Sequence, residues 1–259
     1  MALYGPHDEA KIKRLYELAV EIQEIFREAD LSSYISDNLL ALGRNISFVH
    51  DEPFRQAFED NAQSADDTAK FWRLHTYCWT GRSALDVPGD FVELGVYKGF
   101  YSGVLVDYLE FAGSSKQLYL VDSFAGLAEA WSDPDERDNI NPFYDWNGTY
   151  EQVLRRFAAY DNVHVIKGIV PEVLAEGMPE QIAFLHLDLN AAKAERAAIE
   201  LLGPRVVDGG IVLMDDYGRI EHRQLCETLD AWWRDHDHRV LELPTGQGMV
   251  IRRTRPDGR

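Results

Sequence analysis

The spacing of hydrophobic positions changes near residue 88. Before that point apolar residues recur every three or four positions, which is typical of amphipathic helices. This spacing predicts helices over 11–26, 36–49 and 68–85, with an acidic solvated loop over 59–67. Pro88, Gly89 and Asp90 then interrupt the pattern. Beyond them short apolar runs alternate with helical segments, as expected for buried parallel strands and their crossovers.

The apolar runs define a sheet. They predict five strands, over 91–96, 117–121, 163–166, 182–189 and 210–214. Helices are predicted over 101–112, 149–160, 171–176, 193–202 and 221–236. The turn residues 244–248 separate two further runs and predict a hairpin of strands 239–243 and 249–252. The pattern therefore predicts an α/β fold, a doubly wound, mostly parallel seven-stranded sheet with an antiparallel C-terminal hairpin. We expect an N-terminal helical extension over 1–87 and a sheet domain over 88–259.

Charge and composition exclude several classes of partner. The 259 residues include 26 Lys and Arg against 44 Asp and Glu, a net charge of −18. Nucleic acids and anionic membranes attract basic surfaces, so neither is an expected partner. The segment 1–30 lacks the apolar core of a signal peptide, and no apolar run is long enough to span a membrane. Cys78 and Cys226 form no motif, so we expect a cytoplasmic protein.

Acidic residues close most of the predicted strands. The strand ends carry Glu93, Asp122, Lys167 with Gly168, Asp188, and Asp215 with Asp216. Ligands of parallel sheets bind beyond the carboxyl ends of the strands, so these side chains are candidates for a binding site.

The first strand end is followed by a turn containing Gly95 and Gly99. Glycines there either let a ligand approach the backbone or simply form a tight turn. Glu93 could meet a cationic group such as an ammonium. Ser102, near the start of the next helix, could hydrogen-bond a carboxylate.

The remaining acids allow two interpretations each. Asp122 either accepts hydrogen bonds from ribose hydroxyls or caps a turn with Ser123. Asp188, Asp215 and Asp216 close neighbouring predicted strands, so their carboxylates either converge or cap helices. Three converging carboxylates would repel one another unless a divalent cation bound there. Oxygen-only ligands favour Mg²⁺, Mn²⁺ or Ca²⁺ over zinc.

The motifs at these positions resemble those of class I S-adenosylmethionine-dependent methyltransferases. More narrowly, the chain is similar to the macrocin O-methyltransferase family, which methylates sugar hydroxyls in antibiotic biosynthesis. The matching stretches are 88–99, 121–127, 165–168, 187–190 and 208–217. The resemblance implies a Rossmann-like methyltransferase, an S-adenosylmethionine cofactor, Mg²⁺ or Mn²⁺, and a small-molecule acceptor that carries a sugar. It places the N-terminal helices at the acceptor pocket or at a homodimer contact.

The resemblance also implies a role for each matching residue. Glu93 and Gly95 would lie against the methionine part of the cofactor, with Ser102 near its carboxylate. Asp122 would hold the ribose beside Ser123. The adenine would be lined by Gly168 and Ile169. The metal ligands would be Asp188, Asp215 and Asp216, and Asp188 would also accept the acceptor's proton as general base.

The chain departs from the family after Asp188. The family has a second Asp two residues later and then a Tyr-Glu-Ser type of segment, where this chain has 190–195, Asn-Ala-Ala-Lys-Ala-Glu. The acceptor therefore stays open: a sugar of a polysaccharide or secondary metabolite, a catechol-like phenol, or an amine. A catalytically silent binding protein is a further alternative. A nicotinamide-dependent oxidoreductase is disfavoured because the chain lacks the G-x-G-x-x-G motif.

The acidic segment 129–145 follows neither a helical nor a strand period. It is either a solvated loop or a lid over the acceptor, with aromatic contacts from Trp131, Phe143, Tyr144 and the adjacent Trp146.

Overall fold

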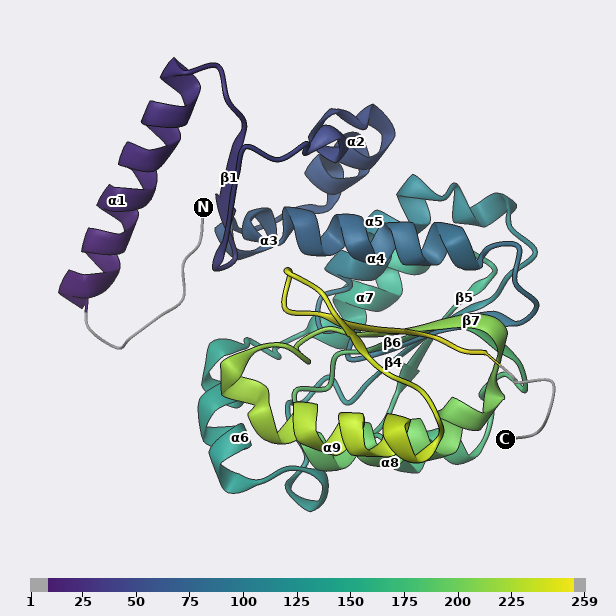
Figure 1. Ribbon diagram of the computed structural model, residues 1–259. Coiled ribbons are helices and arrows are strands. Elements are labelled where there is room, and N and C mark those ends of the chain that lie inside the picture. The colour runs from purple at the N-terminus through teal and green to yellow at the C-terminus, as the bar shows by residue number, and fades with distance from the viewer. Residues whose placement is uncertain (1–8, 254–259) are drawn as a thin grey trace. The chain divides into compact units, whose positions relative to one another are not determined.

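The computed structural model describes residues 9–253 (Figure 1). The chain divides into two compact units, Met1–Thr76 and Tyr77–Arg259. The boundary lies inside helix α4 (Phe71–Ala84), earlier than the predicted boundary after Val87. The reason is that the second half of α4 belongs to the packing of the sheet, where Tyr77 is fully buried and hydrogen-bonds Glu93. No helix among the described residues is long and apolar enough to cross a membrane.

The first unit contains helices and a small hairpin. Its elements are α1 (Glu9–Glu28), β1 (Ser33–Ser36), β2 (Leu39–Leu42), the 3₁₀ helix η1 (Ser47–His50), α2 (Glu52–Asn61) and α3 (Ala65–Ala69). The predicted helix over 36–49 is wrong, because β1 and β2 pair antiparallel there. Asp37 and Asn38 form the turn with φ of 49° and 59°, a conformation that Asp and Asn tolerate better than most residues.

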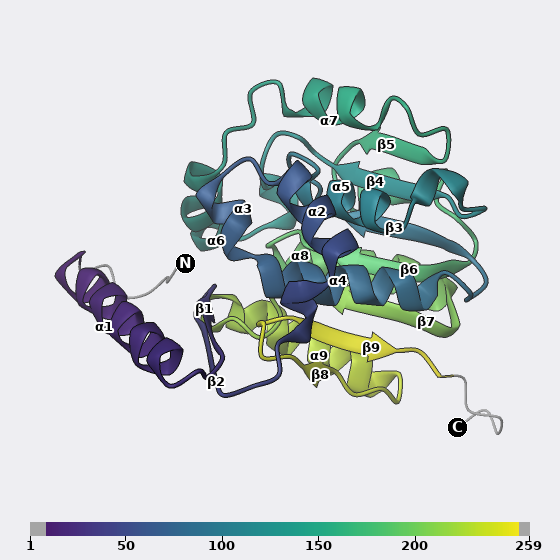
Figure 2. The ribbon, with the colours of Figure 1, turned by 90° about the horizontal axis from the view of Figure 1, so that it is seen from above.

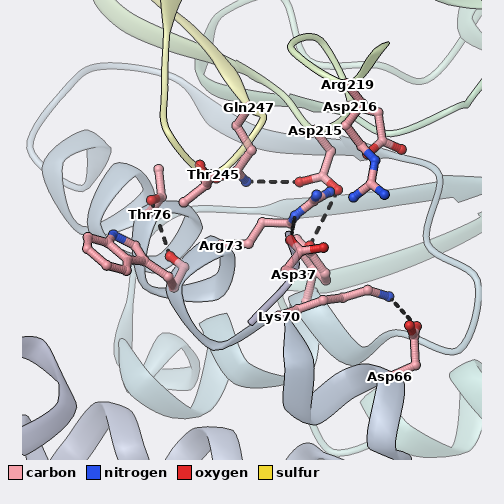
Figure 3. Close-up of polar contacts among 12 residues, drawn as sticks. Asp37, Asp66, Lys70, Arg73, Thr76, Asp215, Asp216, Arg219, Thr245 and Gln247 are labelled. Atoms are coloured by element: carbon pink, nitrogen blue, oxygen red, sulfur yellow. Dashed lines mark hydrogen bonds and ion pairs between the residues drawn. The ribbon is translucent and has the colours of Figure 1, made fainter. Parts of the chain in front are cut away.

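The predicted loop over 59–67 is also partly helical. Asp51 caps α2 by accepting a hydrogen bond from the backbone of Phe54, and α2 then continues to Asn61. Ser64 caps α3 in the same way, through the backbone of Asp67. Within this unit the Arg73 guanidinium on α4 meets the Asp37 carboxylate at 3.0 Å, and both side chains are nearly buried (Figure 3). This ion pair fixes the hairpin turn against α4.

The second unit is built around the predicted seven-stranded sheet. Its strands are β3 (Asp90–Leu94), β4 (Leu118–Asp122), β5 (Val163–Lys167), β6 (Ile182–Leu187), β7 (Val206–Met214), β8 (Leu241–Glu242) and β9 (Gly248–Ile251). They lie in the order β5-β4-β3-β6-β7-β9-β8 (Figure 2). The first five are parallel, and β9 joins β7 antiparallel with β8 outside it. The fold class and the edge hairpin are therefore confirmed.

Helices cover both faces of this sheet. On one face lie α5 (Phe100–Tyr108) and α7 (Thr149–Phe157), and on the other α8 (Ala192–Leu202) and α9 (Arg223–Asp235) (Figure 1). Val92 and Leu94 of β3 belong to the same buried apolar cluster as Trp233 of α9. Phe91 packs against Phe184 on the opposite face. Because side chains alternate along a strand, Glu93 projects to the α5 side.

The segment between β4 and α7 is more ordered than its sequence suggests. It forms the short helix α6 (Pro134–Ile140) between the 3₁₀ turns η3 (Glu129–Trp131) and η4 (Asn141–Phe143). Asp133 and Glu136 cap α6 reciprocally at its first turn. The sequence shows no helical period here because α6 is too short to establish one, and the role of the segment as a lid stays a prediction. The remaining 3₁₀ helices of this unit are η2 (Phe111–Gly113), η5 (Glu172–Ala175), η6 (Gly203–Arg205) and η7 (Ile220–His222).

The strand ends are aligned by backbone hydrogen bonds between neighbouring strands. The N–H of Gly95 donates to Val121, that of Asp188 to Leu94, and that of Asp215 to Leu187. At Gly95 the chain has a φ of 91°, and a Cβ there would lie 1.9 Å from the Asp188 carbonyl oxygen. Only glycine allows β3 to leave the sheet this close to the end of β6.

We predict that Gly95→Ala destabilises the protein much more than Gly148→Ala. Both residues have positive φ, but a Cβ at Gly148 meets nothing within 4 Å. Positive φ costs an alanine roughly 1–2 kcal/mol at either site. At residue 95 the overlap of the Cβ with the Asp188 backbone adds roughly 1–3 kcal/mol. Thermal unfolding of both variants measures the difference. Equal losses of stability would show that strain alone, and not the contact with β6, demands glycine at residue 95.

Candidate functional site

Three carboxylates converge at the carboxyl ends of β6 and β7. Asp188 follows β6, and Asp215 and Asp216 follow β7. One oxygen from each lies within 4.8 Å of the others. Oxygens that bind one Mg²⁺ or Ca²⁺ at about 2.0–2.6 Å lie at most about 5 Å apart, so the three fit a single hard cation. The predicted convergence of these acids is therefore present in the structure.

The two acids after β7 differ in their surroundings. Asp215 is buried, and its Oδ1 accepts a hydrogen bond of 2.9 Å from the Gln247 amide (Figure 3). Its Oδ2 accepts one of 3.3 Å from Tyr101. Asp216 is half-buried, with the Arg219 guanidinium at 3.7 Å and the His222 imidazole at 3.8 Å. Asp215 is thus held by buried side chains, whereas Asp216 lies at the partly exposed edge of the cluster.

Glu93 lies behind the glycine turn, in a buried polar cluster. Its Oε2 accepts hydrogen bonds from the Tyr77 hydroxyl at 2.5 Å and from the Ser102 hydroxyl at 2.8 Å. Glu93 and Ser102 are 2% and 0% exposed, and burial raises the pKa of Glu93. The sequence predicts direct cofactor contacts for both residues. The geometry favours an indirect part instead, because they bond to each other and neither is exposed.

Asp122 organises the turn that follows β3. Its Oδ2 accepts hydrogen bonds from the backbone N–H groups of Val96 and Tyr97, at 2.7 and 2.8 Å. Its Oδ1 accepts a third from Phe124 at 2.6 Å. A carboxylate has about four acceptor sites, so capacity for one further donor remains. These contacts confirm the turn-capping role of Asp122, and its ribose-binding role stays a prediction.

The other predicted cofactor residues lie along the same edge. The Ser123 hydroxyl donates to the carbonyl of Gly126 and closes the turn after β4. The Gly168 N–H donates to the carbonyl of Asp122, which ties the end of β5 to that of β4. Ile169 follows and is 38% exposed. An apolar side chain left open at this edge can pack against a flat apolar ligand.

The segment that departs from the family pattern has its own contacts. Asn190 adopts a φ of 55°, and its side-chain amide donates a hydrogen bond of 3.2 Å to Asp188. An ionised Asp at residue 190 could not make this bond, because it has no proton to donate. Glu195 is buried, and its Oε1 accepts from the Leu189 N–H at 3.0 Å. Its Oε2 has no hydrogen-bond partner among residues 9–253. Burial and the nearby Asp216 and Asp215 raise the pKa of Glu195 to about 8, against the effect of its backbone hydrogen bonds.

The segment 129–146 contacts both halves of the sheet edge that carries these residues. Asp133 forms an ion pair with Lys193, and Glu136 accepts a hydrogen bond from the Ala192 N–H at the start of α8. At the other end Tyr144 and Trp146 pack on the ring of Tyr97, in the glycine turn. Phe143, by contrast, is 83% exposed. The segment thus lies between the turn after β3 and the turn after β6, where a lid would be expected.

Several residues of the site escaped the sequence analysis. They are Tyr77, Tyr101, His186, Glu195, Thr245 and Gln247. Two of them show a local signal, although their partners do not follow from it: His186 is a polar residue in the apolar run of β6, and Glu195 lies on the buried side of α8. Gln247 is fully buried although its turn sequence is typical of an exposed hairpin.

The chain matches the family model described as macrocin-O-methyltransferase over residues 45–240. One curated relative is 8-demethyl-8-(2,3-dimethoxy-alpha-L-rhamnosyl)-tetracenomycin-C 4'-O-methyltransferase of Streptomyces olivaceus, 31% identical over 150 residues, or 54% of this chain and 58% of that protein. Another is mycinamicin III 3''-O-methyltransferase of Micromonospora griseorubida, 26% identical over 182 residues, or 64% and 70% of the two chains. The match thus spans little more than half the length of the first relative.

Solved structures show the same fold. The O-methyltransferase NovP superposes with a TM-score of 0.63 at 21% identity, covering 71% of this chain and 81% of that one. The calicheamicin methyltransferase CalS11 superposes with a TM-score of 0.58 at 17% identity, covering 78% and 92%. These matches confirm the predicted methyltransferase type of sheet.

We predict that Glu195 makes the metal-free protein less stable as the pH rises from 5 to 8. Its folded-state pKa of about 8 lies above the ordinary 4.5, so the folded state retains a proton that the unfolded state releases in this range. One proton corresponds to a slope of at most about 1.4 kcal/mol per pH unit. Glu195→Gln should flatten the dependence, and Glu200→Gln, on the exposed side of α8, should not. Thermal melts at several pH values in excess EDTA measure this, and parallel profiles for wild type and Glu195→Gln would refute it.

Proposed function

The chain belongs to the macrocin-O-methyltransferase family, and on that premise we propose that it is an S-adenosylmethionine-dependent and Mg²⁺-dependent O-methyltransferase. Mn²⁺ is the alternative ion. The proposed acceptor is a hydroxyl group of a sugar, or of another small molecule with a vicinal diol. The observation that carries the proposal is the convergence of Asp188, Asp215 and Asp216 beside the turn at Gly95.

The proposed cofactor site is the edge formed by the ends of β3, β4 and β5. Asp122 would accept a hydrogen bond from a ribose hydroxyl at its fourth acceptor site, beside Ser123. Gly168 and Ile169 would line the adenine. Gly95 would bring the backbone close to the methionine part, with Glu93 and Ser102 supporting the turn from behind. S-adenosylmethionine, when bound, supplies a methyl group activated by a sulfonium.

The proposed metal site uses the three converging acids. A divalent ion held by Asp188, Asp215 and Asp216 would chelate two neighbouring hydroxyl oxygens and lower the pKa of the one to be methylated. Asp188 would accept the proton of that hydroxyl as general base, while the Asn190 amide donates to one of its oxygens. Transfer of the methyl group from the sulfonium to the oxygen neutralises charge, so the positioning of the two reactants should supply much of the rate acceleration.

The relatives support a glycosidic acceptor. The names of the Streptomyces and Micromonospora proteins describe O-methyltransferases of glycosylated natural products. In this chain the aromatic residues of 129–146 lie next to the proposed site and suit stacking on a sugar ring. A panel of glycosides with vicinal diols, catechols and amines tests the acceptor class, and exclusive turnover of catechols or amines would overturn the sugar assignment.

We predict that Asp188→Asn lowers kcat by about 10²–10⁴-fold, as expected for loss of a general base, while S-adenosylhomocysteine still binds. Asp216→Ala should abolish turnover with the same retention of cofactor binding, and excess EDTA should silence the wild type until Mg²⁺ or Mn²⁺ is restored. Product assays and titration calorimetry measure the two properties.

Asp161→Asn serves as the control and should behave as wild type, because Asp161 is an exposed acid that precedes β5 and so lies at the opposite edge of the sheet from the strand ends. Activity that persists in EDTA would refute the metal role. Absence of heat with S-adenosylhomocysteine would refute the cofactor.

A further inference from the structure

His186 is a fully buried histidine whose ring nitrogens lack hydrogen-bond partners in the described part of the chain. It lies on β6, two residues before Asp188, and is 0% exposed. Neither Nδ1 nor Nε2 has a hydrogen-bond partner among residues 9–253. A buried donor left without a partner destabilises a fold, so a residue of this kind requires an explanation.

The ring points at two carboxylates. Its Nδ1 lies 3.9 Å from Glu93 Oε1, and its Nε2 lies 3.9 Å from Asp215 Oδ1. Glu93 is its direct neighbour on β3, because the two residues are Cα partners in the parallel ladder. His186 thus spans the interval between the buried cluster behind the glycine turn and the cluster of three acids.

Aromatic neighbours fix the orientation of the ring. Tyr101 stacks on it with an interplanar angle of 15°, and Tyr77 meets it edge-on at a centroid distance of 4.7 Å. These contacts leave the imidazole little freedom other than a small shift toward one carboxylate or the other. Shortening a separation of 3.9 Å by about 1 Å would give an ordinary hydrogen bond.

A hydrogen-bond donor on the His186 ring affects the three converging acids only on the side that faces Asp215. Gln247 already donates to Oδ1, the oxygen that Nε2 faces, and Thr245 in turn donates to the Gln247 side chain at 2.8 Å. On the other side, Nδ1 faces Glu93 Oε1, and both hydroxyl donors to Glu93 bond its Oε2. Of the two carboxylates only Asp215 belongs to the three converging acids, so a donor on Nε2 would complete a two-sided grip on a proposed metal ligand, from β6 and from the terminal hairpin.

We propose that His186 is a positioning residue, which donates from Nε2 to Asp215 Oδ1 and thereby orients this carboxylate for the divalent ion. The inference rests on the proposed metal site and goes beyond it by assigning a function to a residue that touches neither cofactor nor ion. Donors that orient metal ligands typically contribute about 10–100-fold to metal affinity.

Amide side chains separate the two ring nitrogens. His186→Gln places an amide near the position of Nε2, His186→Asn places one near Nδ1, and His186→Phe keeps the ring without either donor. Mn²⁺ binding is followed by electron paramagnetic resonance, and S-adenosylhomocysteine binding by calorimetry. We expect His186→Gln to bind Mn²⁺ within about threefold of wild type, and the Asn and Phe variants to bind it about 10–100-fold more weakly. Cofactor affinity should stay within about twofold in all three.

His164 provides the matched control. It also lies on a parallel strand, β5, where its Nε2 meets Gln117 at 2.8 Å and its ring packs on Tyr119, away from the acids. His164→Phe should leave Mn²⁺ affinity unchanged.

A second measurement uses the wild type, in case the variants fold poorly. Spectra of the ¹⁵N-histidine-labelled chain with Mg²⁺ should show His186 protonated at Nε2. A proton on Nδ1 with a bare Nε2 would overturn the proposal, as would wild-type Mn²⁺ affinity in His186→Phe or a loss confined to His186→Gln. If the wild type binds S-adenosylhomocysteine but no Mn²⁺, the proposed metal function fails and His186 has no ion to serve.

Discussion

The alignment of the strand ends by backbone hydrogen bonds is the constraint on which the site depends. Three bonds run from the N–H groups of Gly95, Asp188 and Asp215 to carbonyls in the last two residues of adjacent strands, and they bring the ends of β4, β3, β6 and β7 to one level. The acids that follow β6 and β7 must then face each other, whatever their mutual repulsion. The glycine that lets β3 approach the end of β6 is thus as important to the carboxylate cluster as the carboxylates themselves.

The parallel sheet could be predicted because its strands are buried on both faces and appear as continuous apolar runs. From those runs the convergence of Asp188, Asp215 and Asp216 followed directly, since parallel strands end at one edge. The β1-β2 hairpin could not be found this way: four-residue strands are too short to show alternation, and the Asp37-Asn38 turn is visible only once φ is known. His186 and Gln247 were missed because their partners are set by register between distant strands, which no local pattern records.

The segment after Asp188 adds its own polar contacts beside the three converging acids. The Asn190 amide donates to Asp188, and Lys193 pairs with Asp133 at the start of α6. An amide next to Asp188 supplies a donor without adding negative charge, which a carboxylate at residue 190 would add. Glu195 places one more carboxyl group in the same region, and burial there raises its pKa.

The position of Gln247 has a consequence for how the site forms and fails. Its bond to Asp215 joins residues 32 positions apart, and that of Tyr101 to Asp215 joins residues 114 apart. The strands β9 and β8 lie at the edge of the sheet, where an element can open locally without global unfolding. Such an opening would remove the Gln247 donor from Asp215 while the central strands stay paired, so the geometry of this carboxylate can be lost before the fold is.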